Sequence, residues 1–307
     1  MHVVFFNFYH NGDLHASRGL VRATMKKLGS EHTFSYWHRN DPSLLLDIEG
    51  LQHATLIGND RFTGLNEHSN NIRSGIPNET ETVYINTWYN NQHGKYMNRY
   101  GITFDSLYAS FDDSCKQLFG FSLNDISSDV RDFFPTIDYS KFDIGATQEW
   151  LRSNPGTKIL IENGNALSNQ SYNFDFTPII ADLAKKYPDK LFILSKRENI
   201  QLRNVFYTGD ITRKNGCDLN EISYLGTFCD TIIGKASGVF TFTLTRQNLF
   251  ERDVKYICLT NLVTSSGKYW IGDQLKNRVS YKSKFVVANE FDRNRVYSLI
   301  DREISCV

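Results

Sequence analysis

The chain has 307 residues, 40% of them hydrophobic and 14% aromatic, and its 34 Lys and Arg balance 34 Asp and Glu. This length favours two domains of roughly 150 residues each, and the zero net charge disfavours a dedicated nucleic-acid or anionic-membrane surface. The five scattered cysteines predict reduced thiols in a cytoplasmic protein, and we find no signal peptide and no membrane span of ~20 apolar residues.

The first half of the chain alternates strand-like and helix-like patterns. We predict, in chain order, a strand over 2–8, a loop over 9–17, a helix over 18–28, strands over 32–37 and 54–57, an irregular loop over 60–79, a strand over 81–88 and a helix over 103–119. Strands that alternate with helices imply a parallel sheet. All eight histidines fall within the first 93 residues, which favours acid–base or acceptor-binding chemistry in this half.

Weak periodicity and two prolines over 122–155 indicate the connection between domains. We therefore place an N-terminal, acceptor-binding domain at 1–135 and a C-terminal, nucleotide-sugar-binding domain at 136–307. The second half predicts strands over 158–161, 190–194, 205–207, 231–233, 255–259 and 285–288, helices over 178–186 and from 218, and a terminal helix over 292–304 that packs on either domain. The predicted fold class is α/β, with two Rossmann-like domains facing across a cleft.

The loop after the first strand carries the candidate catalytic residues. Asp13 is placed to act as a general base, with His10 or His15 as its orienting partner or as the base itself. The alternative is structural, with Asp13 or Ser17 capping the following helix. Arg18 either holds an anionic group of the acceptor or is solvated.

A second polar loop, over 89–95, follows the strand at 81–88. Its asparagines and His93 suit a hydroxyl-rich acceptor, although a plain polar loop fits equally well. The spacing of His10, Asp13, His15 and His93 is too loose to predict a metal site, so we expect no metal.

The stretch 217–245 is the most informative in the chain. Asp218 and Glu221 have the spacing of a helix capping box. A short apolar strand follows, and then the small-residue turn that contains Lys235, Ser237 and Gly238. Such a turn between a strand and a helix exposes backbone N–H groups at the positive end of the helix dipole, which predicts a diphosphate site.

Three other loops that follow strands of the second half carry further candidates for donor binding. Asn163 and Gly164 allow a phosphate to approach the backbone, or form a simple turn. Lys196 and Arg197 can neutralise a leaving diphosphate, or form a solvated basic end. Gly209 lies where a base or ribose would be met. The sequence contains no GxGxxG after the first strand, no Walker A motif, no GxSxG, no HExxH and no DxD.

Two of these regions resemble the GT-B glycosyltransferases of the heptosyltransferase kind. Residues 11–15 with the helix over 18–28 resemble that family's early Gly-Asp loop and helix, whose Asp serves as the catalytic base. Residues 218–238 resemble its late helix–strand–Ser-Gly block, which holds the donor diphosphate. Residues 159–166 match the strand and glycine loop that open the nucleotide lobe.

The resemblance implies a metal-independent, inverting transferase that moves a sugar from a nucleotide-sugar to a hydroxyl of a glycan or glycolipid. The nucleotide-sugar is a co-substrate, no cofactor is expected, and a lipid-linked acceptor would be met at the membrane surface. Two alternatives stay open: a sugar-nucleotide epimerase or hydrolase on the same scaffold, and a non-catalytic nucleotide- or carbohydrate-binding protein.

Overall fold

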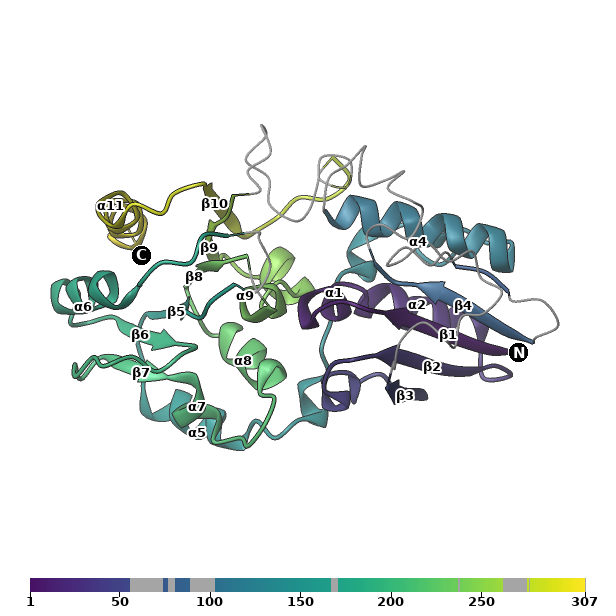
Figure 1. Cartoon of the computed structure of the whole chain (residues 1–307), viewed down its shortest axis with the longest axis horizontal. Helices are drawn as coiled ribbons and strands as arrows, with labels where there is room; N and C mark the ends of the chain where they lie inside the picture. The colour runs from purple at the N-terminus through teal and green to yellow at the C-terminus, as the bar shows by residue number, and fades with distance from the viewer. Residues whose placement is uncertain are drawn as a thin grey trace. The chain divides into compact units, whose positions relative to one another are not determined.

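The computed structural model describes residues 1–55, 74–76, 81–88, 103–166, 171–236, 238–261, 275 and 277–306. The chain divides into two compact units (Figure 1). The first comprises Met1–Thr136 and Trp270–Ser280, and the second comprises Ile137–Tyr269 and Tyr281–Val307.

The described part of the first unit contains a four-stranded parallel sheet in the order β3-β2-β1-β4. Its strands are β1 (His2–Asn7), β2 (Thr33–His38), β3 (Leu51–Thr55) and β4 (Thr82–Asn86). Its helices are α1 (Asn11–Ala16), α2 (Arg18–Leu28) and α4 (Phe104–Phe119), with the 3-10 turns η1 (Pro42–Leu45), η3 (Leu123–Asp125) and η4 (Val130–Phe133).

Helices α2 and α4 pack together and cover one face of this sheet. Phe5 of β1 stacks on Phe111 of α4, with ring centroids 6.2 Å apart. Thr24 of α2 contacts Cys115 of α4. Helix α2 also approaches η4 closely at Gly19, where a Cβ would lie 2.2 Å from the Phe133 carbonyl oxygen. Only glycine fits this contact between α2 and η4.

The described part of the second unit contains a six-stranded parallel sheet in the order β10-β9-β8-β5-β6-β7. Its strands are β5 (Lys158–Glu162), β6 (Leu191–Leu194), β7 (Val205–Tyr207), β8 (Thr231–Lys235), β9 (Lys255–Leu259) and β10 (Lys284–Ala288). Its helices are α5 (Gly145–Ser153), α6 (Thr177–Lys186), α7 (Thr208–Thr212), α8 (Leu219–Gly226), α9 (Gly238–Phe242) and α11 (Arg293–Ile304), with the 3-10 turn η5 (Tyr139–Lys141) and the π-helical turn η6 (Gln247–Glu251).

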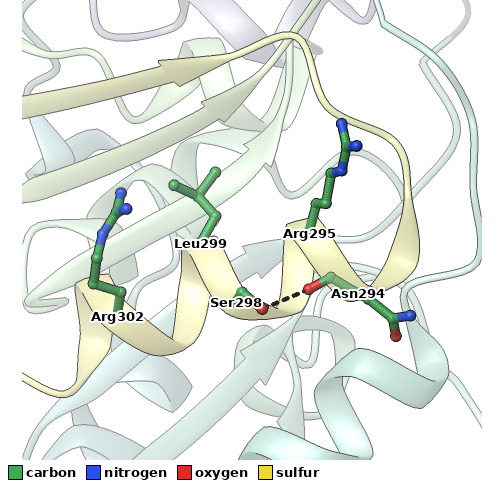
Figure 2. Close-up of a pocket in the computed structure, with 5 residues that line it drawn as sticks. All are labelled: Asn294, Arg295, Ser298, Leu299 and Arg302. Atoms are coloured by element: carbon green, nitrogen blue, oxygen red, sulfur yellow. Dashed lines mark hydrogen bonds between the residues drawn. The ribbon is translucent and has the colours of Figure 1, made fainter.

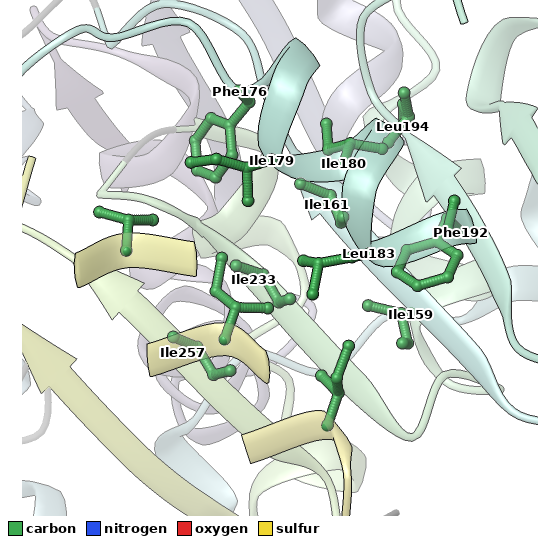
Figure 3. Close-up of a cluster of buried hydrophobic side chains, with 14 of the residues drawn as sticks. Ile159, Ile161, Phe176, Ile179, Ile180, Leu183, Phe192, Leu194, Ile233 and Ile257 are labelled. Atoms are coloured by element: carbon green, nitrogen blue, oxygen red, sulfur yellow. The ribbon is translucent and has the colours of Figure 1, made fainter. Parts of the chain in front are cut away.

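The main core of the second unit lies between its sheet and helices α6 and α11 (Figure 3). Alternate residues of the strands, such as Ile159 and Ile161, point to this side, as the period of two in a strand requires. Helix α11 contributes Val296, Ile300 and Ile304, all at most 1% exposed. The terminal helix therefore belongs to the second unit.

The predicted α/β fold class with parallel sheets is confirmed, and most predicted strands occur within one or two residues of their expected bounds. One local prediction was wrong, because the loop over 9–17 contains α1. Two further helices were not predicted: α7, which begins at Thr208, and α5, which lies within 122–155. Each is a short helix whose few apolar residues give little periodic signal.

The predicted capping box at α8 was also wrong. The Asp218 side chain makes no cap hydrogen bond and instead accepts one from the Thr212 hydroxyl at 3.0 Å. Glu221 is fully buried and pairs with Lys214 at 2.7 Å. The two carboxylates serve tertiary contacts, which residue spacing alone does not reveal.

Candidate active site

Each sheet has one place where the chain reverses its direction of winding. In the first unit this switch point lies between β1 and β4, because β2 and β3 follow on one side of β1 and β4 lies on the other. In the second unit it lies between β5 and β8. Open α/β sheets bind ligands outside the carboxyl ends of the strands at such points. The predicted Asp13 loop follows β1, and Asn163 and Lys235 lie at the ends of β5 and β8.

Asp13 is a half-buried carboxylate in the first turn of α1. Burial raises its pKa to about 6, against the opposing effects of the His10 backbone N–H, the His10 charge and a hydrogen bond from the Trp88 side chain. The His10 N–H donates to Asp13 Oδ2 at 3.2 Å, so the carboxylate also caps α1, whereas the structural alternative expected a cap on the helix at 18–28. A carboxylate with a pKa near neutrality is suited to accept a proton.

The two histidines near Asp13 have different environments. His10 is exposed, whereas His15 is fully buried. His10 is therefore accessible to solvent beside the carboxylate, and the ring of His15 faces the protein interior. Their predicted roles in orienting Asp13 or acting as the base stay predictions.

A buried hydrogen-bond network connects the strands that flank the Asp13 segment. The Tyr36 hydroxyl contacts the hydroxyls of Ser17 and Thr87, and Asn7 Nδ2 donates to Thr87 Oγ1 at 3.4 Å. Burial raises the pKa of Tyr36 to about 12, so its phenol stays neutral. The network links β1, β2, the residue after β4 and the end of α1.

Arg18 lies inside the first unit. It is fully buried, donates to Asp47 Oδ1 at 2.8 Å and also hydrogen-bonds the Leu44 carbonyl. Arg22 donates to the other oxygen of Asp47 at 2.8 Å. These contacts give Arg18 a structural role inside the first unit. Its predicted contact with an acceptor stays a prediction.

Two aromatic residues beside Asp13 had no predicted role. The rings of Tyr9 and Trp88 stack with centroids 4.0 Å apart and planes at 22°. Buried Asn7 and Asn86 each accept, on the side-chain oxygen, the backbone N–H of the residue two positions on, at 2.8 Å for Tyr9 and 2.9 Å for Trp88. The recurrence of Asn, any residue and an aromatic after adjacent strands was the sequence signal for this pair.

A pair of histidines, His38 at the end of β2 and His53 in the middle of β3, was also missed. His53 Nδ1 and His38 Nε2 lie 2.9 Å apart, and the Asn40 N–H donates to His38 Nδ1 at 3.1 Å. The His38 Nε2–H therefore donates to His53. Burial first, and then the neighbouring His53, lower the pKa of His38 to about 4, so the pair is neutral near pH 7.

In the second unit, Asn163 links the ends of β5 and β6. Its Nδ2 donates to the Lys196 carbonyl at 2.9 Å and to Glu198 at 3.2 Å, and its Oδ1 accepts the Lys196 N–H at 2.8 Å. Its own N–H donates to Ser195 Oγ at 3.2 Å. The two predicted donor loops at Asn163 and Lys196 are thus joined directly.

Lys235 joins the two strands at the switch point. Its side chain is buried, and its Nζ donates to the Gly164 carbonyl at 2.8 Å. The ammonium also lies over the rings of Phe174 and Phe176, 5.4 and 5.5 Å from their centroids. Burial lowers the pKa of Lys235, and the nearby Glu162 charge acts in the opposite direction. A positive charge therefore lies directly behind the β5 loop.

The remaining donor candidates follow neighbouring strands. Lys196 is exposed and 3.6 Å from Glu198. Arg197 contacts Asp210 and lies over the Tyr207 ring at 4.5 Å. Gly209, in the first turn of α7, is exposed at the end of β7.

Two predicted site residues, Ser237 and His93, lie outside the described residues. Gly238 begins α9, which has only five residues. The helix whose dipole was expected to favour a diphosphate there is therefore short.

A shallow hollow on the outer side of α11 is a separate feature (Figure 2). It is lined by Asn294, Arg295, Ser298, Leu299 and Arg302. The Ser298 hydroxyl donates to the Asn294 carbonyl at 2.8 Å, and Arg302 pairs with Glu303. A single helix provides the whole lining, so no polar groups converge from different elements as in a typical binding site.

Among the described residues, no three His, Cys, Asp or Glu side chains are grouped as a metal site requires. None of the described helices is long and apolar enough to span a membrane.

Solved structures share the fold along nearly the whole chain. A family 9 glycosyltransferase from Veillonella parvula has a TM-score of 0.54 at 12% identity, over 98% of this chain and 89% of its own. The E. coli heptosyltransferase WaaC with ADP has a TM-score of 0.52 at 9% identity, over 99% and 98%. E. coli ADP-heptose LPS heptosyltransferase II has a TM-score of 0.50 at 11% identity, over 98% of each chain.

No protein-family model matches the sequence, and no curated protein matches it significantly. The resemblance to heptosyltransferase-like GT-B proteins is nevertheless confirmed at the level of the fold.

Proposed function

We propose that this protein is a glycosyltransferase that moves a sugar from a nucleotide-sugar to a hydroxyl of a glycan or glycolipid. The observation that carries the proposal is the chemistry of the two switch points. One holds a half-buried carboxylate with a pKa of about 6, and the other holds amides and ammonium groups on joined loops. The shared fold with family 9 glycosyltransferases supports it.

In this proposal the Asp13 carboxylate removes the proton from the acceptor hydroxyl. The acceptor oxygen then forms a bond to the anomeric carbon of the donor as the bond from that carbon to the diphosphate oxygen breaks. The nucleoside diphosphate leaves with the bonding electrons and gains negative charge. A single displacement of this kind inverts the anomeric carbon.

The second unit would bind the leaving diphosphate without a metal. Lys196 and Lys235 supply positive charge at the ends of β6 and β8, and Gly164 allows close approach to the backbone. Preorganised charges of this type stabilise the transition state at no cost in reorganisation. Of the neighbours, WaaC was solved with ADP and with an ADP-heptose analogue, so adenine nucleotides are the first donors to test.

A cytoplasmic location fits the thiols. The five cysteines are present as thiols, and Cys115, Cys229 and Cys258 are buried. A lipid-linked acceptor would then be met at the membrane surface.

The test is a thermal-shift screen of the whole protein against UDP, GDP, ADP, CMP and their sugar conjugates. A ligand at 100 times its Kd stabilises a protein by about 2.7 kcal/mol. We expect one nucleotide to raise the Tm of the wild type and of Asp13→Asn equally, and to lose that effect in Asn163→Ala. If no nucleotide shifts the wild type, or if Asn163→Ala responds fully, the assignment of the donor site is wrong.

A further inference from the structure

We infer that Tyr9 and Trp88 form the acceptor subsite, an aromatic surface on which a neutral sugar ring stacks with one hydroxyl directed at Asp13. This inference rests on the proposed function, and it names the reacting unit of the acceptor as a pyranose rather than a peptide or a lipid hydroxyl.

The position of the aromatic pair is built into the backbone. Phe6 and Asn86 are register partners on adjacent strands, and the chain turns at Asn7 and Asn86 by the same side-chain hydrogen bond. The two turns bring Tyr9 and Trp88 into a stack at 4.0 Å. Both asparagines are at most 1% exposed, so each turn is anchored in the sheet.

The pair adjoins the candidate base. Asp13 accepts the backbone N–H of His10, the residue next to Tyr9, at 3.2 Å. The Trp88 side chain lies near enough to Asp13 to lower the pKa of its carboxyl, and the Asp13 charge raises the pKa of the Tyr9 phenol, after the larger effect of burial. Both rings are half-buried, so part of each stays open to solvent. A carboxylate, an indole and a phenol therefore meet at one switch point.

This combination matches the chemistry of a sugar. An aromatic ring presents a negative face, and a pyranose presents C–H groups of partial positive charge on one face with hydroxyls around its rim. Stacking leaves a rim hydroxyl free to donate to an ionised carboxylate, which is acceptor-only. A nucleotide could also stack, but its phosphate would be repelled by Asp13.

The test uses saturation-transfer NMR of the full chain with the methyl glycosides of glucose, galactose, mannose and N-acetylglucosamine as probes. We expect at least one to bind through the C–H groups of one ring face, with affinity about tenfold weaker in Trp88→Leu and in Tyr9→Ala. Trp88→Phe should restore most of the binding, because it restores an aromatic face that leucine lacks.

Trp150→Leu is the matched control. Trp150 is also half-buried and packs on Phe206 at 5.1 Å, but it belongs to the second unit. It should leave glycoside binding unchanged. Equal binding in Trp88→Leu and the wild type, no binding of any of the four glycosides, or tighter binding of AMP than of every glycoside at this pair would each overturn the subsite.

The outcomes separate this inference from the proposed function. Glycoside binding that depends on Trp88, in a protein that no nucleotide stabilises, would support the subsite and contradict the transferase. A nucleotide shift that depends on Asn163, without glycoside binding, would support the donor site and contradict the subsite.

Discussion

The two units share one construction but differ at their switch points. Both are parallel sheets that wind outward from a central strand, β1 in the first and β5 in the second. The first edge carries Asp13 and the Tyr9–Trp88 pair, and the second carries Asn163 and Lys235. The two edges thus have the same position in the fold but carry different side chains after their central strands.

Each unit also buries a cation, and by different means. Arg18 is neutralised by Asp47 within hydrogen-bond distance, well inside the first unit. Lys235 is held by a carbonyl and two aromatic faces at the ligand edge of the second. In the first arrangement the Arg18 charge is neutralised by a carboxylate. In the second, Lys235 donates to a carbonyl instead, so its positive charge stays beside the proposed donor site.

The largest effect is expected on catalysis from Asp13→Asn. The amide oxygen can still accept the His10 N–H, so the helix cap is retained, but the amide cannot take a proton. We expect the transfer rate to fall by about 10²- to 10⁴-fold, with nucleotide affinity unchanged in titrations. If the variant kept the wild-type transfer rate, Asp13 would not be the base. The proposed difference in role between the two sheet edges would then be wrong.

The positions of the two switch points were largely predictable from the sequence, because buried parallel strands are recognisable as short apolar runs. The strands at 158–161 and 231–233 located the second switch point, and the apolar run before Tyr9 located the first. Once strands are known, the residues after them are the natural site candidates.

What the sequence did not reveal were contacts between residues distant in the chain. Asp47 is 29 positions from Arg18, so nothing in the local pattern at Arg18 indicated its burial. The stacking of Tyr9 on Trp88 requires the β1–β4 pairing, since 79 positions separate the two residues. Side-chain partners depend on topology, which periodicity describes only coarsely.

The next largest effect is on stability, from Asp47→Ala. This change leaves the Arg18 guanidinium buried without its carboxylate, and breaking a buried pair in this way costs about 3–5 kcal/mol. Urea unfolding of the first unit should show the loss. Asp210→Ala is the control, because the pair of Asp210 with Arg197 is more than half exposed on both sides, and it should cost at most about 1 kcal/mol.

A smaller effect tests the buried cation of the second unit. Lys235→Met keeps the side-chain volume beside Phe174 and Phe176 but removes the positive charge, whose pKa the Glu162 charge raises. We expect Lys235→Met and Glu162→Gln to couple, with the double variant about 1–2 kcal/mol more stable than the sum of the single changes predicts. Strict additivity in denaturation would show that the two charges act independently.

The last effect concerns the pH dependence of stability at Asp13. Its pKa rises from 3.8 to about 6 on folding, so the folded state holds the proton more tightly than the unfolded chain. The stability that this provides is complete below about pH 4 and is lost as the pH rises through 6. Asp13→Asn should therefore match the wild type at low pH and exceed it above pH 6, by about 1–3 kcal/mol after allowance for partial exposure.

Asp125→Asn gives the opposite sign and serves as the control. The Ser122 backbone N–H donates to Asp125 at 2.7 Å and lowers the pKa of that exposed carboxyl. Its ionised form is therefore favoured by folding, and the asparagine variant should be less stable than the wild type above pH 4. If chemical denaturation from pH 4 to 8 showed Asp13→Asn to be the less stable variant as well, Asp13 would be an ordinary helix cap. A carboxylate that weakens the fold at neutral pH is retained for its chemistry, because a cap alone could be supplied by an amide.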